Sequence, residues 1–158
     1  DLGITAAGVP SYVPTDGLIG WWSLDSHAKD ASKFRHDGEI HGATPAQDRF
    51  GRKGRAMDFD GRSAFIEVAD AGNLSLTDSF TVSMWYATSN AAQPVQGVVG
   101  KGTSVGDGTS LNVLLNNGFN TLACGVNDGR INDGVGVDGR YLLDGWTHAA
   151  FKIGRAHV

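Results

Sequence analysis

The chain has 158 residues, 41% of them hydrophobic and 19% charged, and a net charge of −4. A chain of this length can bury one sizeable core without a metal or disulfide staple. Because the net charge is negative and the basic residues are interpreted as not forming a cluster, the chain is not expected to bind nucleic acid. No apolar run approaches the ~20 residues of a membrane-spanning helix, so no membrane insertion is expected.

Turn chemistry dominates the composition. The chain contains 23 glycines without a Gly-X-Y period, and eight of its fifteen aspartates directly precede a glycine. Asp-Gly favours tight turns because Asp tolerates a left-handed φ and Gly adopts it freely. Cys124 has no partner cysteine in the sequence, which excludes an internal disulfide and leaves the redox compartment open.

Residues 1–16 contain two prolines among small and polar neighbours and are interpreted as a linker that enters the domain. Residues 25–37 show no helical periodicity and are predicted to form a long ordered loop. A turn at Asp60-Gly61 is expected to join residues 55–59 and 63–68 in a hairpin. The predicted strands, in chain order, are 17–24, 39–42, 55–59, 63–68, 80–86, 96–101, 110–116, 121–126 and 146–153.

The segment 80–86 carries the clearest strand signal. Phe80, Val82, Met84 and Tyr86 alternate with polar residues and with Trp85, which is typical of a strand with one face in a core. No stretch shows a convincing amphipathic helical pattern. Many short strands separated by turn signals predict an all-β sandwich or barrel.

An ordered series of motifs from about residue 12 to about residue 152 resembles the laminin-G-like, concanavalin A-like jelly-roll modules of large secreted bacterial proteins. The chain departs from that pattern at Ser32-Lys33-Phe34-Arg35-His36, where the usual glycines are missing. The series runs Gly17-Leu18-Ile19-Gly20-Trp21-Trp22-Ser23-Leu24-Asp25, Ala28-Lys29-Asp30-Ala31-Ser32, Asp37-Gly38, His41-Gly42-Ala43-Thr44, Asp48-Arg49-Phe50-Gly51, Phe59-Asp60-Gly61, Phe65-Ile66-Glu67-Val68, Leu74-Ser75-Leu76, Phe80-Thr81-Val82-Ser83-Met84-Trp85 and Trp146-Thr147-His148.

The resemblance implies a two-sheet antiparallel jelly-roll sandwich over residues 17–152, displayed outside the cell or at its surface beside other domains of a longer parent chain. It also implies that the closing strands are missing, so the sandwich is expected to be incomplete at its C terminus. Residues 153–158 match one translated frame of a common sequencing adapter, which predicts an artefactual tail; a natural strand end is the alternative. An open sheet of this kind is expected to be marginally stable.

Catalysis is not expected. Hydrolases on this fold use paired carboxylates, and the nearest approach, Glu67 with Asp70, lacks a third acid. Glu67 is interpreted as the solvent face of a strand, and Cys124 as a core thiol rather than a nucleophile. The protein is therefore predicted not to be an enzyme, although a glycoside hydrolase remains a less favoured alternative.

Metal binding is expected to be limited to calcium. The five histidines lack the spacing of zinc ligands. The resemblance implies that Asp30, and less strongly Asp60, could help to hold one structural calcium, which prefers oxygen ligands from irregular loops. A simple structural role for Asp30 in its loop is the alternative.

Sugar binding depends on exposed aromatic rings with polar neighbours, and Trp85 lies opposite the apolar face among Thr81 and Ser83. Trp85 is the predicted ligand-binding residue, unless a loop or the second sheet covers it. Trp146 is expected in the core and His148 as a structural histidine. The resulting prediction is a non-catalytic module for glycan, cell-surface polysaccharide or adhesion. The alternative is a protein-interaction or spacer domain.

Overall fold

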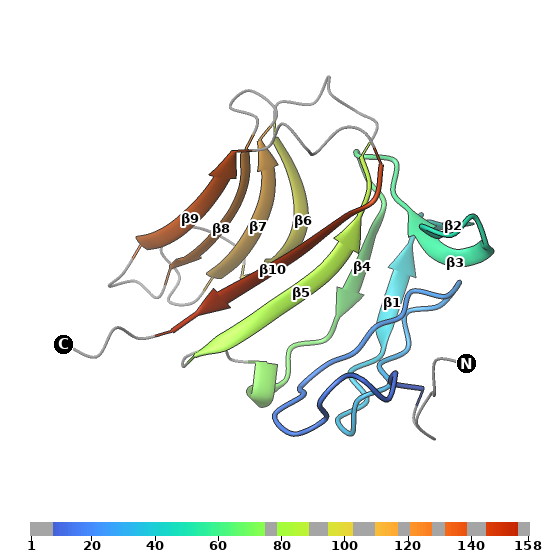
Figure 1. Ribbon diagram of the computed structural model, residues 1–158, viewed down its shortest axis with the longest axis horizontal. Helices are drawn as coiled ribbons and strands as arrows, with labels where there is room; N and C mark the ends of the chain where they lie inside the picture. The colour runs from blue at the N-terminus through green and yellow to red at the C-terminus, as the bar shows by residue number, and fades with distance from the viewer. Residues whose placement is uncertain are drawn as a thin grey trace. The chain divides into compact units, whose positions relative to one another are not determined.

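The computed structural model describes residues 8–74, 79–88, 95–102, 110–116, 121–127, 132–138 and 145–154. This part of the chain is all-β: every sheet is antiparallel, and the helical content is a short 3-10 helix, η1 (Gly72–Leu74) (Figure 1). The chain divides into an N-terminal unit, Asp1–Leu74, and a C-terminal unit, Ser75–Val158. Among the described residues no helix is long and apolar enough to cross a membrane.

The N-terminal unit contains two strand pairs. β1 (Gly38–His41) pairs with β4 (Phe65–Val68), so that Glu39 lies opposite Glu67 and His41 opposite Phe65. β2 (Thr44–Gln47) pairs with β3 (Lys53–Asp58) through a bulged register. A Cβ at Gly38 would lie 2.6 Å from Cγ2 of Ile66, so only glycine fits where β1 begins.

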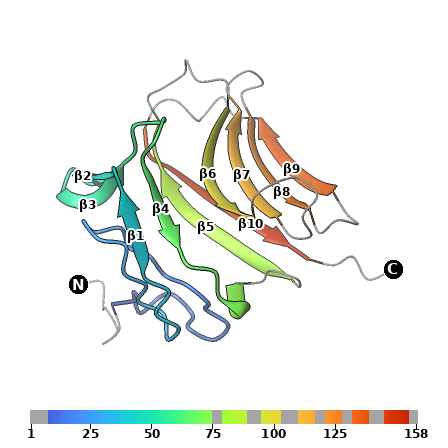
Figure 2. The ribbon, with the colours of Figure 1, turned by 180° about the vertical axis from the view of Figure 1, so that it is seen from behind.

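The C-terminal unit contains two sheets. β6 (Val95–Lys101), β7 (Ser110–Asn116), β8 (Thr121–Asn127) and β9 (Asn132–Asp138) form a meander in sequence order. β5 (Phe80–Tyr86) pairs with β10 (Thr147–Ile153), and Phe80 lies opposite Ile153. The reverse view in Figure 2 shows the meander strands side by side and β5 alongside β10.

Side chains from both sheets of the C-terminal unit share one core, which makes this unit sandwich-like. Period-2 alternation sends every second residue of β5 and β10 inward. Cys124 is buried there, which confirms its interpretation as a core thiol, and burial raises the pKa of its thiol. The buried members are Tyr86, Ala149 and Phe151 from the strand pair, and Val113, Leu122 and Cys124 from the meander.

Several predicted strands are confirmed, with small shifts at their ends. Residues 80–86 and 110–116 match β5 and β7, and the predictions at 39–42, 96–101, 121–126 and 146–153 match β1, β6, β8 and β10 within one residue at each end. A turn at residues 48–51, in which the Gly51 amide donates to the Asp48 carbonyl, separates β2 from β3. These segments combine alternation with turn residues at both ends, the pattern that best distinguishes strands from sequence.

Two predictions in the N-terminal unit are wrong. Residues 17–24 form no strand, and only an isolated bridge joins Trp22 to Asp30, because the Trp21 amide donates to a carboxylate instead of a neighbouring strand. The predicted hairpin of 55–59 with 63–68 does not form, since β3 pairs with β2 and β4 with β1. The Asp60 carboxylate accepts from the amides of residues 62–64 and holds this segment as a wider loop.

The sequence analysis does not predict strands β2 and β9. It also does not predict that Val9 is buried. β2 contains Pro45, and β9 consists largely of Asp, Asn and Gly, which are depleted in strands. Val9 lies in the predicted linker yet is buried, so part of that segment packs against the fold.

Candidate functional site

The outward face of the β5–β10 pair carries the predicted ligand-binding residue. Because the inward residues of both strands enter the core, the alternate residues point away from it. This outer face consists of three directly opposed pairs, Thr81 with Lys152, Ser83 with Ala150 and Trp85 with His148.

Trp85 is 47% exposed, so neither a loop nor the second sheet covers it fully. Its ring lies 5.1 Å from the His148 ring, centroid to centroid, at an interplanar angle of 43°. The Nε2 of His148 is 2.9 Å from the Oγ of Ser83 on the neighbouring strand. One indole, one imidazole and one hydroxyl therefore form a contiguous group, which we call the Trp85 face.

The Trp85 face is held in place from behind. Tyr86, Ala149 and Phe151, which alternate with its members, are buried in the core and fix the strands that carry it. An indole fixed in this way can stack on the apolar face of a ligand ring with little loss of conformational entropy. The Ser83 hydroxyl and the His148 imidazole can exchange hydrogen bonds with ligand hydroxyls.

His148 was predicted to be a structural histidine on the face of Trp146, in the core. It does have a protein partner, Ser83, but it lies on the exposed face. Trp146 precedes β10 and is only half-buried, so the prediction that it is a core residue is wrong. The alternation that indicated its burial begins only at Thr147, inside the strand.

Asp30 is fully buried and organises the loop of residues 19–38. Its Oδ1 accepts from the amides of Trp21 and Ser32, and its Oδ2 accepts from the Ser32 hydroxyl and the His36 amide, all at 2.7–2.9 Å. Burial alone would raise the pKa of Asp30, but these hydrogen bonds outweigh it and hold the pKa below its ordinary value.

The loop closed by Asp30 contains the departure from the glycine-rich pattern. Arg35 adopts a left-handed backbone with φ 57°, a conformation that suits glycine far better than arginine. The next amide, that of His36, donates to Asp30, and the His36 carbonyl accepts from Nε1 of Trp22 at 2.8 Å. Bonds on both sides of His36 thus keep Arg35 in this conformation.

Asp60, the second predicted calcium ligand, is exposed and caps its own loop. Its Oδ1 accepts from the amides of Arg62, Ser63 and Ala64, and its Oδ2 accepts from the Ser63 hydroxyl at 3.0 Å. The amide bonds, that of Ala64 foremost, hold the pKa of Asp60 far below its ordinary value.

Both aspartates already accept several hydrogen bonds within their own loops. A carboxylate offers about four lone pairs, and four donors occupy those of Asp30. Oδ2 of Asp60 accepts a single hydrogen bond, from the Ser63 hydroxyl, and therefore has room for a further contact. Calcium, however, requires six to eight oxygen ligands. Within the described ranges, no group of three His, Cys, Asp or Glu side chains could hold a metal ion. Calcium binding remains a prediction that calorimetry with the full chain can test.

Sequence reasoning missed a cluster on one face of the β1–β4 pair, which we call the acidic face: Glu39, His41, Phe65 and Glu67. The chain's only two glutamates lie directly opposite each other there. His41 Nε2 is 3.9 Å from Glu39 and 3.8 Å from Glu67, and its ring stacks on Phe65 at 4.5 Å. The interpretation of Glu67 as a solvent-facing strand residue is confirmed, and the strand register brings Glu39 to it rather than Asp70.

A second missed feature is the basic loop, defined as Arg49, Phe50, Arg52, Lys53 and Arg55. Four of the chain's thirteen basic residues lie within the seven positions 49–55, so the expectation of dispersed basic residues is wrong here. The signal was visible in the sequence as alternating basic and glycine residues around a phenylalanine.

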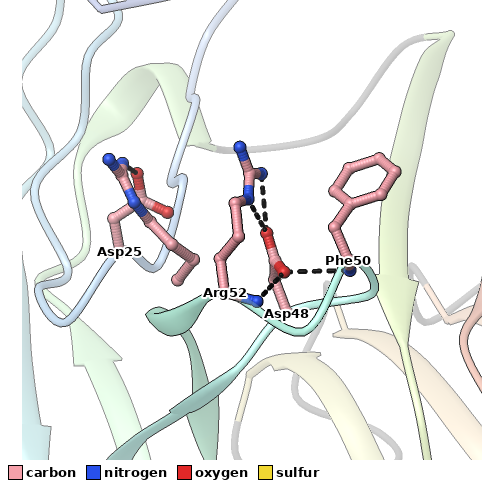
Figure 3. A network of polar contacts seen from close by, with 5 residues as sticks. Asp25, Asp48, Phe50 and Arg52 are labelled. Carbon is pink, nitrogen blue, oxygen red and sulfur yellow. Dashed lines mark hydrogen bonds and ion pairs between the residues drawn. The ribbon is translucent and has the colours of Figure 1, made fainter.

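Buried Asp48 anchors the basic loop. Its Oδ1 accepts from the amides of Phe50 and Arg52, and its Oδ2 is 2.6 Å from the Arg52 guanidinium (Figure 3). Burial raises the pKa of Asp48, but the bonds and charge of Arg52 outweigh this and lower it below its ordinary value. Arg55 pairs with Asp25 at 2.6 Å.

Comparison with known proteins does not assign the chain to a family. No family model, no curated protein and no solved structure matches the chain.

Proposed function

We propose that this protein is a non-catalytic carbohydrate-binding or adhesion module, built as a laminin-G-like, concanavalin A-like jelly roll. The observation that carries the proposal is the Trp85 face: a half-exposed indole beside an imidazole and a hydroxyl, on a strand pair whose alternate residues are buried in the core. A pyranose ring has apolar C–H faces that stack on indole and equatorial hydroxyls that need hydrogen-bond partners. The Trp85 face offers both kinds of contact.

The composition of this face favours binding over hydrolysis. Its six outward residues are Thr81, Ser83, Trp85, His148, Ala150 and Lys152, and none of them is acidic. Glycoside hydrolysis ordinarily requires two carboxylates beside the scissile bond. We therefore propose binding without turnover, with a glycan or cell-surface polysaccharide as the ligand. This role suits a module of a secreted or surface-attached multidomain protein.

Binding to a glycan array tests the proposal. The full chain is expected to bind a restricted set of glycans, and Trp85→Ala is expected to weaken binding by about 2 kcal/mol, roughly thirtyfold, as loss of an aromatic anchor does. Tyr12→Ala is the matched control, because Tyr12 is also an exposed aromatic residue but lies in the other unit. Absence of any glycan signal, or equal binding by Trp85→Ala and the wild type, would contradict the proposal.

A protein-interaction module is the second candidate, and the N-terminal unit provides the observation that favours it. Phe50 and Phe65 are exposed phenyl rings surrounded by charged side chains. Exposed aromatic residues beside arginine are enriched at the centres of protein interfaces. The two candidates are compatible, because the Trp85 face and these rings belong to different units.

A further inference from the structure

Lys152 lies on the same outward side of the β5–β10 pair as Trp85. In the strand register Trp85 is opposite His148, and Lys152, four residues further along β10 than His148, is opposite Thr81. Figures 1 and 2 both show β5 and β10 side by side. The outward residues are all exposed and form a continuous strip, which we call the outer strip: Thr81, Ser83, Trp85, His148, Ala150 and Lys152. Trp85 and Lys152 lie at its two ends.

The two ends of the outer strip are too far apart for one sugar. The chain rises about 3.3 Å per residue along a strand, so the four steps from Trp85 to Thr81, the cross-strand partner of Lys152, span about 13 Å. A single pyranose ring, which is similar in size to the six-membered ring of an indole, cannot contact both ends. The lysine has a long aliphatic stem that can lie along the strip and carry its ammonium group towards a neighbouring sugar. A ligand that uses both ends is therefore an oligosaccharide or a polysaccharide.

Small side chains separate the two ends. The middle of the outer strip consists of Ser83 and Ala150, its two smallest side chains, which are directly opposite each other. Little side-chain volume therefore lies between the indole and the ammonium group. The Ser83 hydroxyl adds a hydrogen-bonding group at this point. A sugar chain placed along the strip would meet the indole, the hydroxyl and the ammonium group in that order.

The positive charge of Lys152 is not balanced on the outer strip. No other member of the strip is acidic, and the cross-strand partner of Lys152 is the neutral Thr81. None of the ion pairs between described residues involves Lys152. Its exposed ammonium group can therefore form a charge-assisted hydrogen bond with an anionic group of a ligand.

The remainder of the chain gives an anion little attraction, so a local contact is required. The net charge is −4, and the overall field therefore repels an anion. In the basic loop, Arg52 and Arg55 are already paired with Asp48 and Asp25. On the outer strip, by contrast, a cation, an aromatic ring and a hydroxyl occur together.

We propose that the outer strip binds an anionic glycan: Trp85 stacks on one sugar, and Lys152 pairs with a carboxylate or sulfate group on a neighbouring sugar. This inference rests on the proposed carbohydrate-binding function and gives Lys152 the role of selecting acidic over neutral glycans. A lysine ammonium is a compact point charge and accepts either kind of anion. One cation beside an aromatic ring suits isolated anionic groups better than a nucleic-acid backbone, whose binding relies on several basic residues.

A glycan array with three arms tests the inference on the full chain. The arms carry neutral oligosaccharides, uronic-acid oligosaccharides and sulfated oligosaccharides, and each acidic glycan is printed beside its carboxyl-reduced or desulfated counterpart. The wild type is expected to bind at least one acidic glycan about tenfold more tightly than that counterpart, the effect of one hydrogen bond to a charged group. This preference should decrease at about 0.5 M salt, because the contact is exposed. The arm that binds distinguishes carboxylate from sulfate.

Substitutions test whether Lys152 is the source of the preference. Lys152→Gln should bind the acidic glycan about tenfold more weakly, and its neutral counterpart as the wild type does. Lys152→Arg keeps the charge and should keep the preference. Lys29→Gln removes an equal charge at an exposed position of the other unit, so it is the matched control and should bind as the wild type does. Trp85→Ala should weaken the binding of both acidic and neutral glycans.

The outcomes separate this inference from the function on which it rests, provided that circular dichroism shows each variant to be folded. Equal binding of acidic glycans and their neutral counterparts, or an unchanged preference in Lys152→Gln, would overturn the role of Lys152 and leave glycan binding intact. A similar loss in Lys29→Gln, or equally tight Lys152-dependent binding of polyphosphate, would show that charge alone acts and would also overturn it. Absence of binding in every arm would overturn both proposals.

Discussion

The rings of Trp85 and His148 face each other across β5 and β10, with their centroids 5.1 Å apart. The two residues are directly opposed in the strand register, so backbone hydrogen bonding sets their spacing. Ser83, two positions from Trp85 on the same strand face, contacts Nε2 of His148. One indole ring thus lies beside an imidazole whose orientation a neighbouring hydroxyl helps to fix.

Removing that hydroxyl should affect His148 rather than the fold. Ser83→Ala is expected to change the free energy of unfolding by less than about 0.5 kcal/mol, because the contact is exposed. The imidazole loses a hydrogen-bond partner, so its tautomer ratio should shift, as measured by nitrogen NMR of the ring. Thr81→Ala, on the same strand face, should leave the ratio unchanged. An unaltered ratio in Ser83→Ala would show that the contact does not orient His148.

Asp30 should be the most sensitive polar position of the N-terminal unit. Asp30→Asn turns one acceptor oxygen into a donor group that faces existing donors, in a fully buried position. We expect a loss of about 3 kcal/mol in unfolding free energy, which a urea titration followed by tryptophan fluorescence would measure. Asp16→Asn, an exposed change of the same kind, should have little effect. Equal stabilities for the two variants would contradict the role given to Asp30.

Stability should fall in acid for the same reason. The pKa values of Asp30, Asp48 and Asp60 are lowered on folding. A carboxyl with a depressed folded pKa contributes stability above its unfolded pKa, near 3.8, and this contribution is lost as the pH falls through the folded value. Unfolding midpoints should therefore be steady near neutral pH and decline below about pH 4. In Asp30→Asn the decline should be shallower, and an equally steep decline would exclude Asp30 as a source of it.

Arg35 should be a position where glycine stabilises the protein. Its left-handed φ of 57° carries a cost for any residue with a Cβ. Arg35→Gly is expected to raise the free energy of unfolding by about 0.5–1 kcal/mol. Part of this gain is offset because glycine gives the unfolded chain more conformational entropy. Lys33→Gly, in the same loop without a positive φ, should destabilise. The prediction would be contradicted if thermal melts showed that Arg35→Gly and Lys33→Gly destabilise the protein to the same extent.

Sequence patterns predicted the C-terminal unit better than the N-terminal unit, and the reason is physical. β5 and β7 alternate apolar and polar residues, so their period alone locates them. In the N-terminal unit, aspartate side chains replace strand neighbours as partners of the backbone: Asp30 accepts the Trp21 amide, and Asp60 accepts three amides that a tight hairpin would have used. Such side-chain competition leaves no periodic trace in the sequence.

The candidate site was partly predictable. Trp85 follows from the alternation of a single strand, because its place opposite Phe80, Val82 and Met84 requires no knowledge of pairing. His148 could not be assigned to the same face without the register of β10 against β5, which joins segments far apart in the sequence. The opposition of Glu39 and Glu67 likewise depends on β1 pairing with β4 rather than β3 with β4. The basic loop, by contrast, can be predicted from the sequence alone, because its four basic residues lie within seven positions.

The pairing of β5 with β10 also bears on the order in which the protein folds. Contacts such as Ser83 with His148 span 65 residues, and β6 to β9 lie between the two strands in the sequence. Closing so long a loop costs entropy before any contact compensates, which slows folding. During synthesis, β5 cannot form its hydrogen-bonded pair with β10 until the ribosome has released β10. Until then the hydrogen-bonding edge of β5 that β10 occupies stays open to other nascent chains, whereas β2 and β3 can pair almost as soon as they emerge.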